Sequence, residues 1–160
     1  MDFVTAVKTC LTEKYATFSG RASRSEFWWF MIFVIISWLV VTILGAAIGV
    51  RLLSLLYLLA LIWPTTAAGF RRLQDMGRPG WIILFPLGTA LLLLIGVPLY
   101  VIQLVASIGP DGPQTNLHIG LPSVVLIILT VQLVVSAPFI YWLTRPSEPE
   151  TNAYGPPPQA

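Results

Sequence analysis

The sequence predicts an all-α integral membrane protein, a four-transmembrane-helix bundle preceded by an amphipathic helix in the membrane interface. The first observation behind this fold class is composition. Of the 160 residues, 56% are hydrophobic and only 10% are charged, whereas soluble domains carry roughly 25% charged residues. The second observation is that the charges leave four long segments uncharged, and the third is that the basic residues fall unequally between the connections of these segments.

Each uncharged segment is long enough to form a helix that crosses a hydrocarbon core of about 30 Å, at about 1.5 Å per residue. The sequence predicts spans near 26–49, 52–74, 80–106 and 121–143. Residues 1–145 therefore form a single predicted membrane domain. Residues 146–160 are rich in proline and polar residues, which predicts a cytoplasmic tail that is extended or disordered unless it docks.

The basic residues predict that both termini lie in the cytoplasm. Of the nine Lys and Arg residues, eight belong to the N-terminal segment, the second connection and the tail, and only Arg51 belongs to the first connection. The positive-inside rule places the more basic side in the cytoplasm. Four spans, an even number, return the chain to the side on which it started. Aromatic residues near the same ends, such as Trp28 and Trp81, agree with an interfacial belt.

Local patterns predict where the helices begin and end. Apolar residues at helical spacing predict an interfacial helix over 2–18, lying either on the bilayer or docked on the protein's own spans; they are Phe3, Val7, Cys10, Leu11 and Phe18. The capping-box spacing of Ser23 and Glu26 predicts that the first span begins at Arg24. Gly77 is suited to a left-handed C-terminal cap after the second span.

Two further patterns concern the packing of the spans. Prolines inside the second, third and fourth spans predict kinks; they are Pro64, Pro86, Pro98 and Pro138. The pattern Gly45-x-x-x-Gly49 in the first span would permit close contact with another helix, including one from a second copy of the chain.

Several functional classes find no support in the sequence. The formal net charge of +2 is too small for a nucleic-acid binder. One Cys and one His, at position 118, exclude a disulfide framework and clustered metal ligands. Since motifs for nucleophilic, metal or phosphate chemistry are also missing, we expect a non-enzymatic protein without a cofactor or metal. Gln132 is the deepest polar side chain, and no ionisable residue lies within the core of a predicted span, which disfavours coupled transport.

The remaining charged residues converge at the predicted cytoplasmic ends of the first three spans. They form a candidate binding site, with tryptophans that fix its depth in the membrane: Arg21, Arg24, Glu26, Arg71, Arg72, Asp75, Trp28 and Trp81. Arginines beside helix N-termini are suited to an anionic group such as a lipid phosphate. The alternative is an internal salt-bridge network, in which Glu26 caps a helix and Asp75 pairs with Arg71 or Arg72.

Three functional hypotheses follow from the predicted topology and this candidate site. In the leading hypothesis, the protein is non-enzymatic and binds anionic membrane lipids or an acidic partner through the arginine site. In the second, it is a structural or scaffold subunit that holds a protein partner or forms a homo-oligomer. In the third, it is a small transporter or channel with a hydrated path past Gln132.

Three sequence segments resemble one known family. Residues 20–28 (GRASRSEFW) resemble a G-R-x-S-R-x-E-[FY]-W entry to a first span, and residues 71–81 (RRLQDMGRPGW) resemble an R-R-L-H-D-x-G-x-S-G-W connection. Residues 152–156 (NAYGP) resemble the ending N-x-Y-G-x-x-P. These are patterns of the bacterial inner-membrane family "domain of unknown function 805", the YhaH-type proteins. The resemblance implies a small multi-pass protein of the bacterial cytoplasmic membrane and assigns no reaction. Gln74 stands where the family usually has His, and Pro79 where it usually has Ser.

Overall fold

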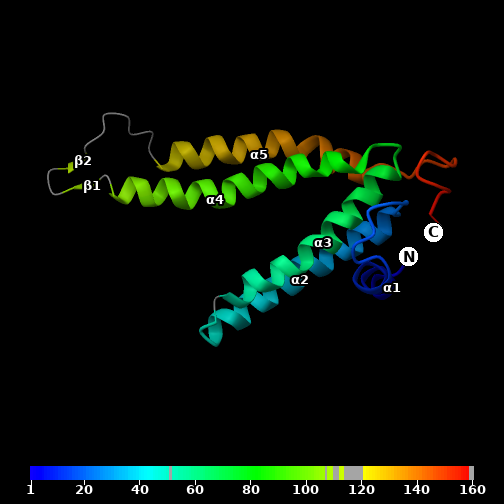
Figure 1. Cartoon of the computed structure of the whole chain (residues 1–160), viewed down its shortest axis with the longest axis horizontal. Coiled ribbons are helices and arrows are strands. Elements are labelled where there is room, and N and C mark those ends of the chain that lie inside the picture. The colour runs from blue at the N-terminus through cyan, green and yellow to red at the C-terminus, as the bar shows by residue number, and fades with distance from the viewer. Residues whose placement is uncertain (51, 107, 110–111, 114–120, 159–160) are drawn as a thin grey trace. The chain divides into compact units, whose positions relative to one another are not determined.

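The structure, a computed structural model, describes residues 1–50, 52–106, 108–109, 112–113 and 121–158. Its main elements are four long helices, α2 (Arg24–Ala47), α3 (Leu52–Gln74), α4 (Leu84–Ala106) and α5 (Leu121–Thr144) (Figure 1). Within these residues, four helices are long and apolar enough to be candidate membrane spans, which confirms the predicted class of an α-helical membrane protein. Arg51, His118 and most of the connection over 109–116 lie outside the described residues.

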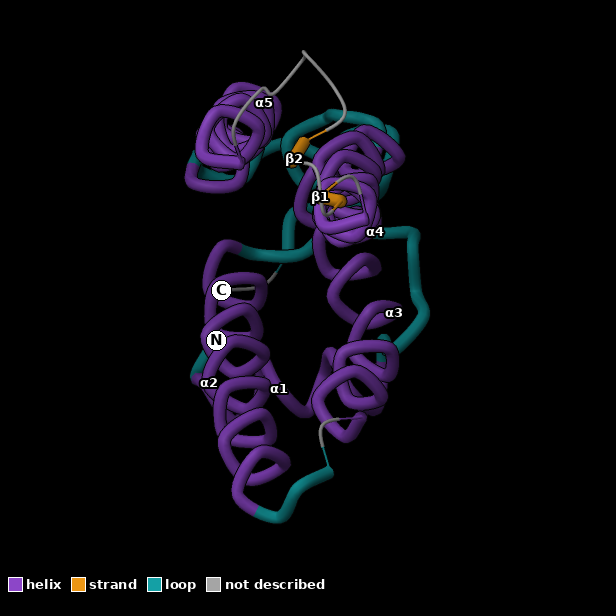
Figure 2. The backbone as a smooth tube through the Cα atoms, turned by 90° about the vertical axis from the view of Figure 1, so that its left-hand side faces the viewer, coloured by secondary structure: helices purple, strands orange, loops and turns teal. Residues whose placement is uncertain are grey.

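The chain divides into two compact units, and the first contains both termini. It comprises residues 1–83 together with the segment from Trp142 onward. Helices α2 and α3 lie side by side in it (Figures 1 and 2), so that the start of α2 meets the end of α3. The core is concentrated at this end, where Phe27 and Phe30 of α2 and Ala67 and Leu73 of α3 are buried.

The N-terminal helix is shorter than the predicted interfacial helix. Helix α1 (Phe3–Lys8) continues as a π-helical turn, η1 (Thr9–Glu13), and packs against α2. The helical backbone therefore ends before Phe18 rather than after it. The ring of Phe18 lies 5.1 Å from that of Phe70, because the segment after η1 turns back onto α3. These contacts correspond to the alternative in which the segment docks on the protein's own spans.

The Gly45–Gly49 pattern does not form a face of one helix. Helix α2 ends at Ala47, and Gly49 adopts a φ of +76° in the turn that follows. A Cβ atom on Gly45 would lie 2.9 Å from the carbonyl oxygen of Val50. The small residue at position 45 therefore accommodates the chain's own turn, and the pattern gives no support for a dimer.

The second unit comprises Leu84–Tyr141, which includes α4 and most of α5. Between these helices, the short strands β1 (Ile108–Gly109) and β2 (Gly112–Pro113) pair antiparallel. The side-chain amide of Gln132 donates to the hydroxyl of Ser136 at 2.9 Å and to the carbonyl of Pro86 at 3.5 Å. Gln132 thus bonds to groups within the protein, as polar side chains in membrane helices commonly do.

The third predicted span begins with a different type of helix. The segment η2 (Gly80–Ile83) is a 3-10 helix, and α4 follows it directly.

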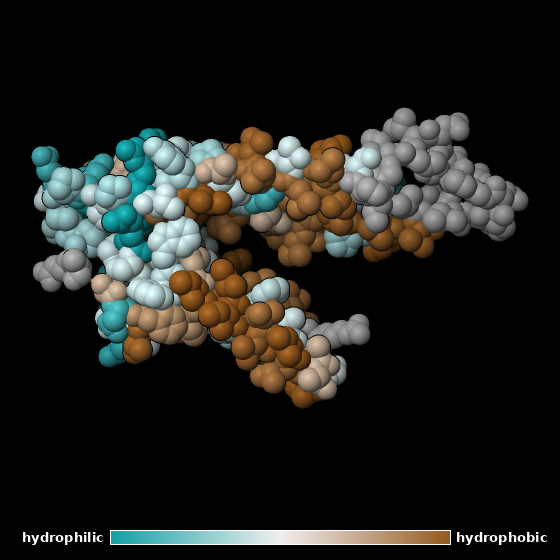
Figure 3. Space-filling model, turned by 180° about the vertical axis from the view of Figure 1, so that it is seen from behind, coloured by the Kyte–Doolittle hydropathy of each residue, from teal (hydrophilic) through white to brown (hydrophobic). Residues whose placement is uncertain are grey.

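Hydrophilic side chains gather around the N-terminal segment and the C-terminal tail, while apolar side chains cover the lengths of the helices (Figure 3). The polar end of the first unit is therefore where a functional site is to be sought.

Candidate functional site

An arginine–carboxylate cluster forms where the start of α2 meets the end of α3; we use this name for Arg21, Glu26, Arg71, Arg72 and Asp75. The start of α2 is fixed by Ser23, whose hydroxyl accepts from the backbone N–H of Glu26 at 3.1 Å, a typical N-cap bond. The helix begins at Arg24, as the sequence pattern predicts. Just before it, the N–H of Ala22 donates to the carbonyl of Arg71 at 3.1 Å, which ties the two helix ends together.

The end of α3 is a Schellman motif. The N–H of Arg78 donates to the carbonyl of Leu73 at 3.0 Å, and that of Gly77 to the carbonyl of Gln74 at 3.1 Å. Gly77 has a φ of +65°, the left-handed conformation that this cap requires and that glycine adopts without steric cost. The predicted C-terminal cap is therefore confirmed. It turns the chain away immediately after Arg71, Arg72 and Asp75.

Glu26 and Arg71 form the first half of the cluster. Their ion pair joins α2 to α3, and the two side chains are 2% and 1% exposed. The ammonium group of Lys14 lies 3.9 Å from the other carboxylate oxygen of Glu26. The predicted capping box is therefore formed only in part, because Ser23 caps the helix while the carboxylate of Glu26 pairs with Arg71. A buried charge needs such a partner, since leaving it unpaired costs several kcal/mol.

The thiol of Cys10 lies beside this ion pair. Its sulfur is 3.7 Å from Nη2 of Arg71 and 3.9 Å from Oε1 of Glu26. Burial raises the pKa of the Cys10 thiol to about 11, although the neighbouring Arg71 acts in the opposite direction. The thiol is therefore neutral near pH 7, and a neutral thiol is a poor nucleophile.

Asp75 holds the second half of the cluster, because it pairs with two arginines at once. One carboxylate oxygen lies 2.8 Å from Nε of Arg21, and the other lies 2.5 Å from Nη1 of Arg72. The side chain of Asp75 is fully buried, and those of the two arginines nearly so. Of the two pairings that the sequence allowed for Asp75 on α3, the structure has the one with Arg72, because Arg71 is turned toward α2.

Arg72 also caps the last turn of α5. Its Nε donates to the carbonyl of Leu143 at 3.1 Å, and its Nη2 donates to the carbonyl of Arg145. The last carbonyls of a helix lack intrahelical partners and form the negative end of its dipole, so a buried cation is favourable there. One side chain thus links the end of α3 to the end of α5.

Arg21 holds the C-terminal tail, by which we mean residues 145–158. Its guanidinium donates to the carbonyls of Glu148 at 2.5 Å and of Glu150 at 2.7 Å, and to that of Gly155 at 3.2 Å. The tail is therefore neither extended away from the membrane domain nor independent of it. The excess positive charge of two arginines around one carboxylate is balanced by these carbonyl dipoles.

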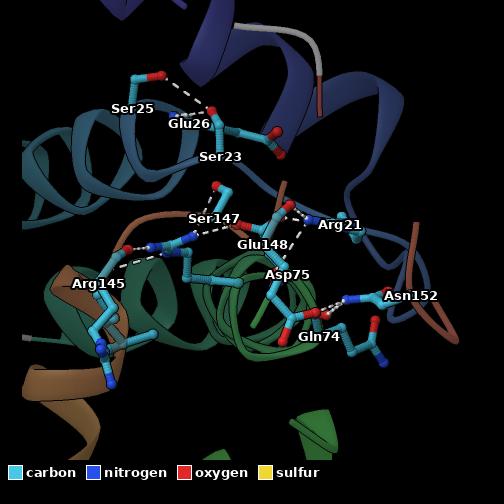
Figure 4. Close-up of polar contacts among 12 residues, drawn as sticks. Arg21, Ser23, Ser25, Glu26, Gln74, Asp75, Arg145, Ser147, Glu148 and Asn152 are labelled. Atoms are coloured by element: carbon cyan, nitrogen blue, oxygen red, sulfur yellow. Dashed lines mark hydrogen bonds and ion pairs between the residues drawn. The ribbon is translucent and has the colours of Figure 1, made fainter. Parts of the chain in front are cut away.

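A turn at Asn152 completes the docking of the tail. The side-chain oxygen of Asn152 accepts from the N–H of Tyr154 at 2.9 Å. Its amide nitrogen donates to the carbonyl of Gln74 at 3.0 Å and to the carboxylate of Glu148 at 2.8 Å (Figure 4). The amide of Gln74 in turn donates to the carbonyl of Phe18 at 3.0 Å. The residues that resemble a family ending therefore dock directly on the segment that resembles the family connection.

The structure brings together five of the eight residues predicted for the site. The other three are exposed and lie outside the cluster: Arg24, Trp28 and Trp81. Sequence reasoning missed Cys10, Lys14 and the carbonyls of the tail. The apolar spacing that includes Cys10 was a usable signal for its burial. Backbone acceptors carry no residue-type signal, so the arginine contacts to the tail could not be read from the sequence.

The cluster is closed to ligands by its own partners. All three arginines are buried and paired with carboxylates or carbonyls of the same chain. Among the described residues, none of the His, Cys, Asp and Glu side chains group in a way that could hold a metal ion. The arrangement favours the internal salt-bridge network over an open anion site at Arg21, Arg71 and Arg72.

Four long apolar helices define a multi-pass α-helical membrane protein, in which a buried ionic cluster ties the start of α2 to the ends of α3 and α5. The chain belongs to the family described as "Protein of unknown function (DUF805)", whose model matches residues 15–156. It is similar to the "Inner membrane protein YhaI" of Escherichia coli K12, with 41% identity over 76 residues, which cover 46% of this chain and 64% of the relative.

A second relative is the "Inner membrane protein YhaH" of the same strain, with 33% identity over 75 residues, which cover 43% of this chain and 62% of the relative. The matches thus span less than two thirds of each of these relatives. No solved structure matches the chain. The family is one of unknown function, and both relatives are described as inner membrane proteins.

Proposed function

We propose that this protein is a non-catalytic structural protein of the inner membrane, which holds a partner at the end that carries the cluster. The supporting observation is that Arg21, Arg71 and Arg72 are all buried and bonded within the chain. The three segments that resemble the family are thereby bonded to one another. We call the start of α2, the end of α3 and the tail, joined in this way, the cap. Such a cap presents a defined surface without chemistry of its own.

The leading hypothesis from the sequence assigned the cluster to an anionic lipid headgroup or an acidic partner. Burial argues against this role for the three paired arginines, since a headgroup would have to displace carboxylates and carbonyls that are already in place. Arg24 is exposed at the same end and takes part in none of the ion pairs among the described residues. A transporter or channel finds less support, because Gln132 is hydrogen-bonded within its own unit.

We infer that the cap and both termini face the cytoplasm, as the positive-inside rule predicts. Labelling of a single introduced cysteine, Thr151→Cys, in a Cys10→Ser background tests this orientation in spheroplasts. Thr151 is exposed in the tail. We expect a membrane-impermeant maleimide to label it only after the membrane is opened. Labelling in intact spheroplasts would contradict the orientation.

Mild crosslinking in membranes, followed by purification, tests the structural role. We expect the wild-type chain to carry a crosslinked partner, either a second copy or another membrane protein. The variant Asp75→Asn, which disrupts the cap, should lose that partner, whereas Glu150→Gln should keep it. Glu150 is a matched control because Arg21 uses its backbone carbonyl and not its carboxylate. Recovery of the wild-type chain only as a monomer would contradict the proposal.

A further inference from the structure

We propose that a cavity beside the cap binds the phosphate of a phospholipid headgroup. The cavity has a volume of about 380 Å³, and its lining includes Met76, Arg78, Trp142, Arg145, Ser147 and Glu148. This site is distinct from the closed cluster and does not depend on the structural role proposed above.

Arg78 is the main donor for the phosphate. Its guanidinium carbon lies 4.6 Å from the centre of the Trp142 ring, and among the described residues it has no carboxylate within ion-pair distance. A guanidinium that rests on an aromatic face keeps its N–H groups in its own plane, where a phosphate can accept two of them. Arg78 is exposed, so these groups are accessible, unlike those of the cluster arginines.

The charge of the cavity matches one phosphodiester. Its lining contains two arginines, Arg78 and Arg145, and one acid, Glu148, which leaves one unit of positive charge. The carbonyl end of α5 would repel an anion. Here the negative charge of these carbonyls is offset, because Arg72 donates to the carbonyls of Leu143 and Arg145. The buried cluster thus neutralises a feature that would oppose phosphate binding.

The position of the cavity favours a lipid as the source of the phosphate. Trp142 belongs to the last turn of α5, a candidate span that ends at Thr144, and Arg145 follows immediately. Tryptophan at the end of a span sits at the level of the headgroups. Arg78 lies in the connection that directly follows α3. A headgroup beside α5 therefore reaches the cavity at its own depth, without entering the protein.

Native mass spectrometry of the full-length protein in detergent, with added phosphatidylglycerol, tests this site. We expect wild type to retain one phospholipid, and Arg78→Gln to bind it about tenfold more weakly, as expected for the loss of a charge-assisted hydrogen bond. Arg78→Lys should fall between them because it keeps the charge and loses the planar fork. The control is Arg24→Gln, which removes an exposed arginine at the same end that does not line this cavity, and which should bind like wild type.

Three outcomes would overturn the proposal: no retained phospholipid in wild type, equal affinities of wild type and Arg78→Gln, or equal losses in Arg78→Gln and Arg24→Gln. Inorganic phosphate at millimolar concentration separates the two sources of the group. Failure of inorganic phosphate to displace the phospholipid supports a lipid site. Displacement would show that the site takes free phosphate, and would overturn the assignment to a headgroup.

Discussion

Asp75 offers the sharpest test of the cluster, because one carboxylate balances two buried arginines. The substitution Asp75→Asn keeps the shape of the side chain and removes its charge. The ion pairs with Arg21 at 2.8 Å and with Arg72 at 2.5 Å are then lost together. Removing one partner of a buried pair costs about 3–5 kcal/mol, most of it from the charge left without compensation. For a chain of this length, that corresponds to a fall in Tm of about 6–20 °C.

Tryptophan fluorescence during heating in detergent micelles measures this change in Tm. Glu150→Gln is the control, because it removes an acid from the same tail while leaving the backbone carbonyl that Arg21 uses; we expect its Tm to stay within about 2 °C of wild type. A double-mutant cycle with Arg21→Gln should show that the losses are not additive, since the two side chains share one interaction. If Asp75→Asn melts like Glu150→Gln, the cluster does not stabilise the fold and our reasoning is wrong.

Three further predictions concern the cap and the neighbouring Cys10. Gly77→Ala should destabilise the protein by about 1–2 kcal/mol, because φ is +65° and the new Cβ would lie 2.7 Å from Oε1 of Glu148. The control Gly88→Ala, where the added Cβ meets open space on α4, should leave the stability unchanged. Equal Tm values for the two variants would contradict the prediction. Deletion of residues 147–160 should lower Tm, because Arg21 loses three carbonyl acceptors; an unchanged Tm would show that the tail does not contribute. Cys10 should resist maleimide at pH 7.5 until the protein is unfolded. Burial raises the pKa of the Cys10 thiol from 9.0 to about 11. The stability that the neutral thiol contributes is therefore complete below pH 9 and is lost as the pH rises from 9 to 11. If a Cys10→Ser variant lost the same stability over this pH range, the prediction would be refuted.

The local sequence was sufficient to predict the ends of individual helices. Ser23 starts α2 through a hydrogen bond within one helical turn, and Gly77 ends α3 because only its own backbone conformation is involved. Both signals act between residues close in the chain. The same reasoning was less successful for the N-terminal segment, where η1 ends at Glu13 because the following residues turn toward α3.

The pairing of the charged residues could be predicted only in part. The sequence placed Arg21, Glu26, Arg71, Arg72 and Asp75 at one end of the helices, because the uncharged segments between them have to cross the same bilayer. It could not choose between Arg71 and Arg72 as the partner of Asp75, since both lie within one turn of it. That choice depends on which side of α3 faces α2 and which faces the tail.

The sequence by itself determined the class of this protein, because long uncharged segments have few stable solutions other than membrane helices. It also placed the arginines at one end of the helices, because charged side chains are unfavourable in the hydrocarbon core. Only the tertiary structure decided that these arginines are closed. Arg21 and Arg72 donate to carbonyls of the tail and of the end of α5, more than 70 residues away in the chain, and every residue type offers the same carbonyl. Burial of the arginines therefore follows from how the chain returns to α3, which no local pattern encodes.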